Sequence, residues 1–380
     1  MAPPRQARRA LRIAFYAPLK APDHPVPSGD RTMARLLQAA LAHAGHRVET
    51  VSTLRAWLRE PAADAIAALT AQAAAERARI AAQWHAGGAP DLWFCYHPYY
   101  RAPDLLGPPL AAQFGLPWVS AEASWAGKRE VDAWAPLQAA VSAALTQGAL
   151  HLCFTERDRA GLARVVPAAR LAALAPFIAA PPPPPRPPRA PDAPPALIAV
   201  AMLRPGAKLD SHRRLAAALG TLLERPWHLT LVGDGPARAE VEAAYAAIPA
   251  ARLSWTGELD AAAVAARLAA ADVYVWPGCG EAYGLAYLEA QAAGLPVVAL
   301  ATAGVPAVVR DGETGLLAAP DTPGAYAAAL ARLLDDAALR ARLGAAAQRF
   351  VHDERTLAAA AARLGALLDS LPLPRDDARR

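Results

Sequence analysis

Two glutamates, Glu281 and Glu289, stand eight positions apart in the stretch GCGEAYGLAYLEAQAAGLPVVAL, residues 278–300, which contains no other charged residue. Glu281 follows an apolar run, and Gly280 and Gly284 let the backbone approach a ligand closely. Amides at the start of a helix favour anions. If the intervening segment is helical, Glu289 lies about 12 Å beyond Glu281. The alternative is that Glu281 caps the helix and Glu289 is solvated.

Two cations in MLRPGAKLDS, Arg204 and Lys208, come between an expected strand and an expected helix. Lys208 is one of only three lysines in a chain with 39 basic residues. Arginine binds phosphate bidentately and lysine binds it as a point charge. With the two carboxylates, these residues predict a site for a nucleotide-diphosphate sugar, with cations on the diphosphate and acids on the sugar and ribose. An ordinary surface position is the alternative for Lys208.

The first half of the chain offers a second group of candidates. Gly29 in PSGDRT could present an amide to phosphate, or could belong to a plain turn before a helix. His97 and Tyr99 follow the expected strand DLWFCY, where a histidine could bind an acceptor or assist proton transfer. A structural histidine beside aromatic residues is the alternative.

Further polar residues follow other expected strands. Glu122 ends LPWVSAEAS, and Lys128 and Arg129 come next; they could line an acceptor site or form a salt-bridged loop. Gly233 in LVGDGP allows a tight strand-to-helix turn. Cys279 has no basic partner nearby, so small-residue packing is expected there.

Strand and helix patterns alternate along the chain, which predicts a doubly wound α/β fold with parallel sheets. In the first half, expected strands cover 11–16, 46–52, 91–98, 116–124 and the run from 151, and expected helices cover 31–45, 62–84, 104–114 and the segment capped by Thr155. In the second half, strands are expected at 196–203, 228–235, 252–257, 272–278 and 296–300, and helices from 211, at 237–248, at 261–271 and around Glu289.

A proline-rich run separates the two halves. Residues 179–195, AAPPPPPRPPRAPDAPP, predict a semi-rigid linker in polyproline II form, with an SH3-type ligand as the alternative. We therefore expect an N-terminal Rossmann-like acceptor domain over 1–178 and a nucleotide-sugar domain over 196–354. Residues 355–380 should hold one more helix, returning to the first domain, and a frayed tail, LPLPRDDARR. Two such domains would place the carboxyl ends of both sheets across a cleft.

Composition narrows the class of protein. The formal net charge is +5 and the basic residues are dispersed, which does not favour nucleic acid as a partner. Glycine and proline interrupt the longest uncharged run, so no spanning helix is expected, and the N-terminus lacks a secretory h-region. Three scattered cysteines without a CxxC pair suit a reducing cytoplasm and indicate neither a metal nor a disulfide framework.

The stretch GEAYGLAYLEAQAAGLPVVA resembles the E-x7-E signature of retaining GT-B glycosyltransferases of family 4. AGVPAVVRDGETGLL is similar to the segment that follows it in that family, and LVGDGP, RLSWTGELD and the Arg204/Lys208 pair fall in the expected order. The resemblance covers most of 197–350. It is looser over 11–180, where the PSGDRT loop and the fold order carry it.

The resemblance implies a GT-B fold with two Rossmann-like domains facing a central cleft, and retaining, metal-independent transfer of a hexosyl-type sugar from a nucleotide sugar to an acceptor hydroxyl. It assigns catalysis to Glu281, Arg204 and Lys208, and we add His97 as a candidate. The implied donor-binding residues are Gly29, Gly233, Glu258, Gly280, Tyr283, Gly284, Leu285 and Glu289.

We thus expect a cytoplasmic enzyme of cell-envelope or other glycoconjugate synthesis, with no cofactor and with a saccharide or lipid-linked acceptor. The alternatives are a non-catalytic nucleotide-sugar-binding subunit and a nucleotide-sugar epimerase of the same fold. The segment STLRAWLREP, with Arg55, Trp57 and Arg59, could give peripheral contact with the inner face of the membrane, or could be an ordinary surface loop.

Overall fold

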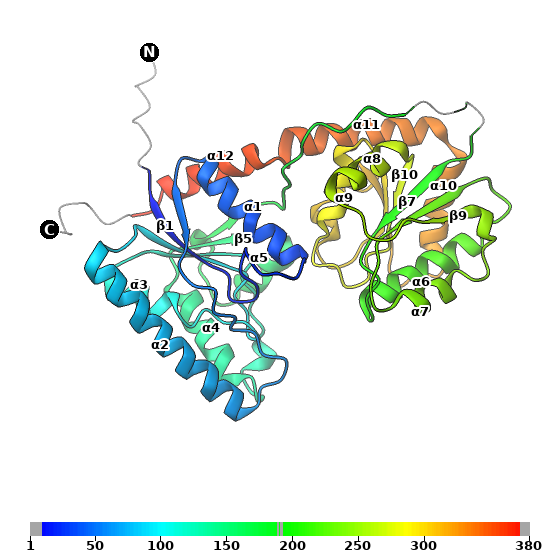
Figure 1. Cartoon of the computed structure of the whole chain (residues 1–380). Helices are drawn as coiled ribbons and strands as arrows, with labels where there is room; N and C mark the ends of the chain where they lie inside the picture. The colour runs from blue at the N-terminus through cyan, green and yellow to red at the C-terminus, as the bar shows by residue number, and fades with distance from the viewer. Residues whose placement is uncertain (1–9, 188–189, 191–192, 373–380) are drawn as a thin grey trace, which may run out of the picture. The chain divides into compact units, whose positions relative to one another are not determined.

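A computed structural model of the chain describes residues 10–187, 190 and 193–372. It divides into two compact units, an N-terminal unit of residues 1–175 and 357–380 and a C-terminal unit of residues 176–356 (Figure 1). Each unit is built on one six-stranded sheet in which every paired strand is parallel. The predicted doubly wound parallel fold is therefore confirmed.

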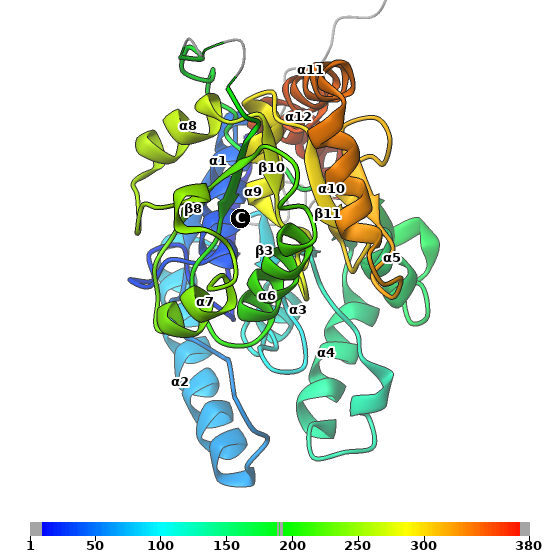
Figure 2. The same ribbon diagram turned by 90° about the vertical axis from the view of Figure 1, so that its right-hand side faces the viewer.

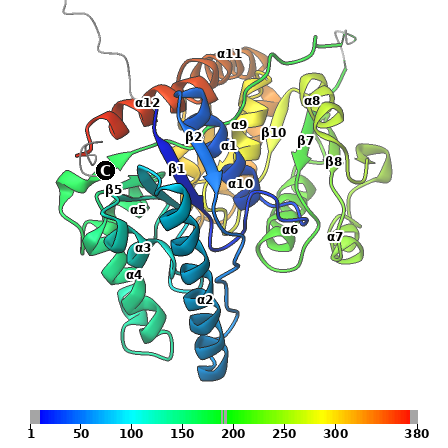
Figure 3. The ribbon, with the colours of Figure 1, turned by 60° about the vertical axis from the view of Figure 1, so that its left-hand side comes forward.

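The sheet of the N-terminal unit has the strand order β2-β1-β3-β4-β5-β6. The strands are β1 (Arg12–Tyr16), β2 (Arg47–Thr50), β3 (Leu92–Tyr96), β4 (Trp118–Ala121), β5 (Leu150–Cys153) and β6 (Leu171–Ala173). The helices are α1 (Gly29–His43), α2 (Ala63–Gly87), α3 (Gly107–Phe114), α4 (Ala135–Gln147), α5 (Glu156–Leu162) and α12 (Leu357–Asp369). Helix α12 packs beside α1, while α2, α3 and α4 lie on the other face of the sheet (Figures 1 and 3).

The sheet of the C-terminal unit has the order β12-β11-β10-β7-β8-β9. Its strands are β7 (Ala196–Val200), β8 (His228–Val232), β9 (Leu253–Trp255), β10 (Val273–Val275), β11 (Val297–Leu300) and β12 (Gly315–Ala318). Its helices are α6 (Ala207–Gly220), α7 (Arg238–Ala244), α8 (Ala261–Ala270), α9 (Leu285–Ala292), α10 (Ala325–Asp335) and α11 (Ala337–Glu354). Helix α6 contacts α7 and α10, and α9 contacts α11 (Figure 2).

Buried aromatic residues form much of the core of the N-terminal unit. Trp93 and Tyr16 are fully buried with α2, α3 and α4 residues around them. The carboxylate of Asp104 accepts hydrogen bonds from the indoles of Trp93 and Trp118, both at 2.8 Å, and from the amide of Gly107 at 2.7 Å. Because the Asp104 carboxylate holds the amides of Leu106 and Gly107 in a turn, α3 begins at Gly107 and not at the predicted position 104.

Other helix boundaries also differ from the predictions. Helix α1 begins at Gly29, two residues early, because Ser28 caps it by accepting a hydrogen bond from the amide of Arg31. Helix α6 begins at Ala207, not at 211, and α7 ends at Ala244. The predicted cap at Thr155 is confirmed, with Asp158 completing a capping box.

Five elements had no counterpart among the predictions: β6, β12, α4, α10 and α11. In the proline-rich run, the described residues 179–187, 190 and 193–195 form neither helix nor strand. Positions 188–189 and 191–192, and most of the predicted frayed tail, lie outside the described residues. Across the part of the chain that the structure describes, no helix has both the length and the apolar character needed to cross a membrane.

Candidate active site

The predicted cation Lys208 lies in the first turn of α6, at the carboxyl edge of the C-terminal unit's sheet. Its position within the helix, and not before it, corrects the sequence prediction. Lys208 forms an ion pair with Glu281, and its ammonium lies 5.5 Å from the centre of the Trp276 ring. The Trp276 indole also donates a hydrogen bond of 3.2 Å to the same Glu281 oxygen. The structure thus brings two of the predicted residues, Lys208 and Glu281, into direct contact beside Trp276.

The segment between β10 and α9 holds Glu281 in a glycine-rich loop. Gly278 has φ +76°, and a Cβ there would lie 2.1 Å from the hydroxyl of Tyr287. Gly284 has φ +82°, and a Cβ there would lie 2.7 Å from the Tyr287 ring. That buried ring is fixed in turn, because its hydroxyl donates to the Trp276 carbonyl at 3.0 Å. The loop around Glu281 is therefore held by backbone conformations that only glycine adopts without strain.

The predicted helix containing Glu289 is α9, which starts at Leu285. Glu281 therefore lies in a non-helical loop, and the predicted helical separation of about 12 Å between the two glutamates is wrong. Only the four steps from Leu285 to Glu289 follow the helical rise, about 6 Å. Gly284 and Leu285 do lie at the start of this helix, where the first amides have no carbonyl partner within the helix.

Glu289 lines a pocket of about 430 Å³ in the C-terminal unit. The carboxylate is exposed to this pocket, and the protein around it raises the pKa of Glu289 by desolvation. The rest of the lining is mostly apolar. It comes from the proline-rich run, the end of β7, the loop before α8, α8 itself and the end of α9: Pro181–Pro184, Val200, Leu259, Val264, Leu268 and Ala292. Because the pocket has one acid and otherwise apolar walls, it suits a ligand in which a polar ring is joined to a flat apolar part.

Gly233 lies between β8 and α7, where the sequence predicted a strand-to-helix turn. Its φ is +138°, and a Cβ would lie 1.9 Å from the carbonyl oxygen of Ala201. Its amide donates to the Gly257 carbonyl at 2.8 Å. Gly233 therefore joins the loops that follow β7, β8 and β9, and its contact with a donor stays a prediction.

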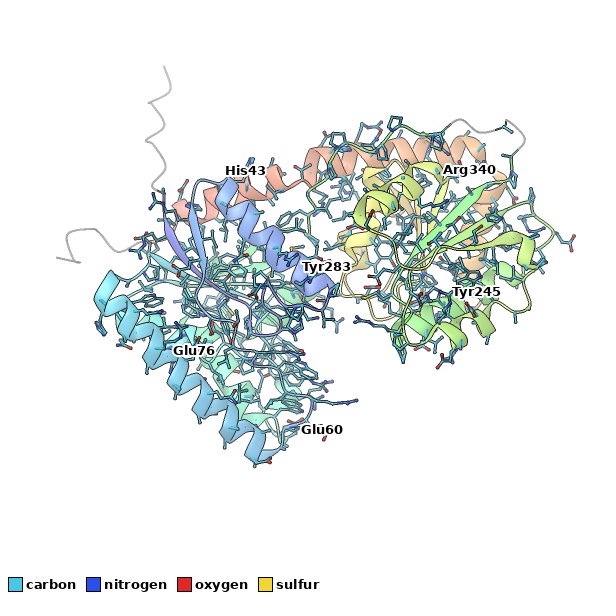
Figure 4. The ribbon with its side chains drawn as sticks, in the orientation of Figure 1. His43, Glu60, Glu76, Tyr245, Tyr283 and Arg340 are labelled. Atoms are coloured by element: carbon cyan, nitrogen blue, oxygen red, sulfur yellow. The ribbon has the colours of Figure 1, made fainter. Side chains whose placement is uncertain are left out.

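Three other predicted donor residues occupy varied surroundings. Glu258 is exposed in the loop that follows β9, and Arg204 is exposed in the loop that follows β7. Tyr283, which is labelled in Figure 4, is buried. Arg204, Glu258 and Tyr283 thus remain predicted ligand contacts, and the burial of Tyr283 places it within the loop that carries Glu281.

In the N-terminal unit, predicted residues gather at the carboxyl edge of the sheet. His97 follows β3 and Glu122 follows β4, and their amides continue the ladder by donating to Ala121 at 2.8 Å and Leu152 at 2.9 Å. Their φ values are +58° and +55°, an uncommon conformation for residues other than glycine. Strained backbone of this kind clusters at functional sites.

A network of charges surrounds these two strained residues. His97 Nδ1 lies 3.1 Å from Asp30 in the first turn of α1, and the Tyr96 hydroxyl donates to Glu122 at 2.9 Å. Burial lowers the pKa of His97, but Glu122 and Asp30 outweigh it and raise that pKa to about 9. Burial raises the pKa of Glu122 to about 7, against the opposing charge of His97. The edge therefore holds a protonated imidazole and an acid that titrates near neutrality.

The remaining candidates of the N-terminal unit differ in their surroundings. Gly29 is the first residue of α1, and a Cβ there would meet no atom within 4 Å, so its backbone does not require glycine. Its amide stays a predicted phosphate contact. Arg129 pairs with Asp132 at 2.7 Å, which confirms the salt-bridged-loop alternative for that residue, and Lys128 is exposed.

Sequence reasoning missed three residues that shape these sites. Trp276 contacts Lys208 and Glu281, and the aromatic that follows the apolar run VYV was its signal. His212 packs edge-on against Trp276 at 4.9 Å; burial lowers its pKa to about 4, and it lies 3.3 Å from the Tyr245 hydroxyl (Figure 4). Asp30 adjoins the predicted Gly29, but only the fold reveals its contact with His97.

Comparison with known proteins matches part of the chain by sequence. Residues 194–336 match the family described as "Glycosyl transferases group 1". The D-inositol 3-phosphate glycosyltransferase of Streptomyces avermitilis is 50% identical over 80 residues, which are 21% of this chain and 17% of that protein. The protein of the same description from Corynebacterium glutamicum is 47% identical over 100 residues, 26% of this chain and 23% of that one. The chain thus aligns with less than a quarter of each relative's length.

Solved structures match nearly all of the chain in fold. Sucrose-phosphate synthase from Thermosynechococcus elongatus has a TM-score of 0.72 and 22% identity, covering 95% of this chain and 98% of that one. HepE from Anabaena in complex with UDP-glucose has a TM-score of 0.67 and 16% identity, covering 95% and 100%. The chain therefore has the GT-B fold, two Rossmann-like parallel α/β units, and its C-terminal unit matches glycosyl transferases group 1 in sequence.

Proposed function

We propose that this chain is a retaining glycosyltransferase that moves a hexosyl group from a nucleotide-diphosphate sugar to an acceptor hydroxyl, without a metal. The observation that carries the proposal is the Lys208–Glu281–Trp276 contact at the carboxyl edge of the C-terminal sheet. It joins a cation and an acid within the segment that matches the glycosyltransferase family. Ligands of open parallel sheets bind at that edge.

In this proposal the diphosphate lies beside Lys208 and the amides at the start of α9. The ammonium stabilises the charge that develops on the leaving diphosphate, since preorganised electrostatic stabilisation is often the largest catalytic term. Glu281, held by the Trp276 indole, binds hydroxyls of the donor sugar. Arg204, exposed nearby, adds a bidentate contact to the phosphates.

The nucleoside would occupy the pocket that Glu289 lines. Its size and mostly apolar lining suit a base, and the carboxylate suits the ribose hydroxyls. A raised pKa keeps the proton on Glu289 to a higher pH than usual, and either protonation state can accept a hydrogen bond from a hydroxyl. HepE, solved in complex with UDP and with UDP-glucose, supports a nucleotide-sugar donor for this fold.

The acceptor hydroxyl would attack from the face that the diphosphate leaves, which retains the anomeric configuration. The acceptor would bind in the N-terminal unit near His97, whose protonated ring can donate to it. We place the reaction in the cytoplasm, in the synthesis of a cell-envelope or other glycoconjugate. The relatives described as D-inositol 3-phosphate glycosyltransferases support a polyol or saccharide acceptor.

The first experiment is a thermal-shift screen with UDP-, GDP- and ADP-sugars, because a ligand that binds the folded state raises apparent stability. The stabilising sugar is then incubated with candidate acceptors, and the anomeric configuration of the product is read by NMR. We expect transfer with retention, unchanged by EDTA. Interconversion of the donor without an acceptor would indicate an epimerase, and binding without turnover of any kind would indicate a non-catalytic subunit.

A further inference from the structure

The carboxylate of Glu281 has two partners that differ in kind. Lys208 forms an ion pair with its Oε1 atom, and the indole of Trp276 donates a hydrogen bond of 3.2 Å to the same atom. Among the described residues, no other side chain bonds to this carboxylate. The side chains of Lys208 and Glu281 are 29% and 18% exposed, whereas Trp276 is buried. A ligand can therefore reach the ion pair, while the indole lies beneath it.

Trp276 is held in place by contacts that do not involve Glu281. Its amide donates to the Val298 carbonyl at 3.1 Å, and its own carbonyl accepts from the buried Tyr287 hydroxyl at 3.0 Å. The buried ring of His212, from α6, packs edge-on against the indole at 4.9 Å. Because backbone and ring are both fixed by buried groups, the position of the indole N–H does not depend on the ion pair.

The backbone of the loop is also attached to α6 by a contact other than the ion pair. Ser211 is fully buried, accepts a hydrogen bond from the amide of Cys279 at 2.9 Å and donates to the Ala207 carbonyl at 2.8 Å. Separation of Lys208 from Glu281 therefore requires movement of two side chains and leaves the loop in place.

A diphosphate that binds Lys208 competes with Glu281 for the same ammonium. The proposed function requires the diphosphate contact, and an ion pair that is this exposed contributes little stability. The diphosphate carries more negative charge than the carboxylate, so it can replace Glu281 as the partner of Lys208. Glu281 then loses its cation but keeps the hydrogen bond from the Trp276 indole, and a hydrogen bond to an ionised group is one of the stronger kinds.

We propose that Trp276 is a positioning residue that holds Glu281 for the donor sugar once the diphosphate has taken Lys208 away from it. The inference rests on the proposed glycosyl transfer, because it describes how the donor of that reaction is recognised. In the free protein, Glu281 neutralises Lys208. In the complex, the diphosphate neutralises Lys208, and Glu281 accepts hydrogen bonds from the Trp276 indole and from sugar hydroxyls.

The first test measures whether Glu281 competes with the diphosphate. Calorimetry on the full chain compares UDP with UDP-glucose, GDP with GDP-mannose and ADP with ADP-glucose, and the pair that binds the wild type most tightly is used for the variants. Glu281→Gln should bind the nucleoside diphosphate about fivefold more tightly than the wild type, because a competing half-exposed ion pair is lost. The matched control is Glu313→Gln, which should bind as the wild type does. Glu313 is an exposed glutamate before β12 that also forms an ion pair, with Arg310 at 3.2 Å.

The second test removes the indole N–H alone. Trp276→Phe keeps an aromatic ring beside Lys208 but has no donor for Glu281. It should leave the affinity for the nucleoside diphosphate within about twofold of the wild type and weaken binding of the nucleotide sugar about 10-fold, because a hydrogen bond to a charged group is lost. The matched control is Trp227→Phe, since the buried indole of Trp227, which precedes β8, also donates a hydrogen bond, to the Leu222 carbonyl at 2.9 Å. This control should change neither affinity.

A third measurement tests the inference without a variant. In a crystal structure of the wild type with the nucleoside diphosphate alone, we expect the Lys208 ammonium at the diphosphate and Glu281 within hydrogen-bond distance of the Trp276 indole. An intact ion pair between Lys208 and Glu281 in that complex would overturn the inference. Circular dichroism shows whether each variant used in calorimetry is folded.

The outcomes separate this inference from the proposed function. If the nucleoside diphosphate binds but Glu281→Gln does not bind it more tightly, the exchange of partners at Lys208 is refuted and the donor proposal stands. Equal losses for both ligands in Trp276→Phe would also overturn the inference, because a positioning residue for Glu281 affects the sugar alone. If no member of the three pairs binds the wild type, the proposed function itself fails.

Discussion

The two candidate sites of this chain are built in opposite ways. In the C-terminal unit, the residues around Glu281 lie within one short loop and one helix turn, and glycines with positive φ hold them. In the N-terminal unit, Asp30, His97 and Glu122 come from three distant segments, and residues other than glycine adopt the strained conformation. The geometry of the first site thus depends on backbone conformation, and that of the second depends on contacts between charged side chains.

This difference explains what each site is suited to do. A nucleotide diphosphate is common to many reactions, and a rigid backbone loop can hold it with few side chains. An acceptor varies from enzyme to enzyme, and side chains on separate strands can change independently. The charge network also makes the N-terminal site sensitive to pH, because it contains a histidine with a pKa of about 9 and a glutamate with a pKa of about 7.

The largest expected effect comes from removing a charge of the C-terminal site. Lys208→Ala should lower transfer from the donor by on the order of 100-fold, because the developing charge on the diphosphate loses its cation. Glu281→Gln should show a loss of similar size. The measurement is kcat/KM with the sugar found in the thermal-shift screen. The control is Arg213→Ala, because Arg213 is an exposed residue of the same helix α6. Full activity in both Lys208→Ala and Glu281→Gln would contradict a catalytic role for the C-terminal site.

The second prediction compares how replacing one glycine in each site changes the free energy of unfolding. Gly284→Ala places a methyl group 2.7 Å from the Tyr287 ring at φ +82° and should lower the free energy of unfolding by about 1–3 kcal/mol. Gly29→Ala meets open space in a helix and should raise that free energy by about 0.4–1 kcal/mol. Urea unfolding of both variants checks this; equal effects would show that backbone shape does not distinguish the two sites.

The third prediction concerns the pH dependence of stability in the N-terminal unit. The folded pKa of His97, about 9, exceeds its ordinary value of 6.5, so folding takes up a proton between these values. The resulting stabilisation is complete below about pH 6.5 and disappears as the pH rises through about 9, roughly 3 kcal/mol in all. Glu122, Asp30 and Asp158 are the acids that face this histidine.

Urea unfolding of wild type and His97→Gln at about pH 6 and about pH 10 measures this term. We expect the difference between the two proteins to shrink as the pH rises. His43→Gln, an exposed histidine in the last turn of α1 in the same unit, should show no such trend (Figure 4). A difference that stays constant across this range would mean that His97 does not hold its proton through these neighbours.

The smallest expected effect concerns Glu289, which lines the pocket that we propose binds the nucleoside of the donor. Glu289→Gln should weaken UDP binding by about 10-fold, because an amide replaces a carboxyl group that the ribose hydroxyls contact. The matched control is Glu240→Gln in the first turn of α7, an exposed glutamate outside the pocket. Calorimetry with UDP makes the comparison, and an unchanged affinity in Glu289→Gln would move the ribose away from this pocket.

The sequence predicted the C-terminal site better than the N-terminal one, for a physical reason. Glu281, Gly284 and Glu289 are near neighbours in the chain, and Lys208 follows the adjacent strand, so local pattern and strand order place them. The prediction was wrong about where α9 starts. Only the positive φ of Gly284 shows that the loop continues to that residue. Trp276 was missed because an aromatic residue directly after a strand usually belongs to the hydrophobic core.

The N-terminal network was only partly predictable. His97 and Glu122 could be placed after adjacent strands, but Asp30 contacts His97 across 67 positions of sequence, and no local pattern indicates such a contact. The alternating strands predicted the doubly wound fold. Strands β6, with the sequence LAA, and β12, with the sequence GLLA, escaped prediction because neither contains a β-branched or aromatic residue, the types enriched in strands.

The central claim is that a nucleotide-diphosphate sugar binds at the C-terminal unit through Lys208, Glu281 and Glu289. A crystal structure of the chain with UDP-glucose tests it most directly. We predict the diphosphate within hydrogen-bond distance of the Lys208 ammonium, the hexose at Glu281 and the ribose at Glu289. A nucleotide sugar bound with its diphosphate away from Lys208, or no binding at a concentration that saturates HepE, would contradict the account.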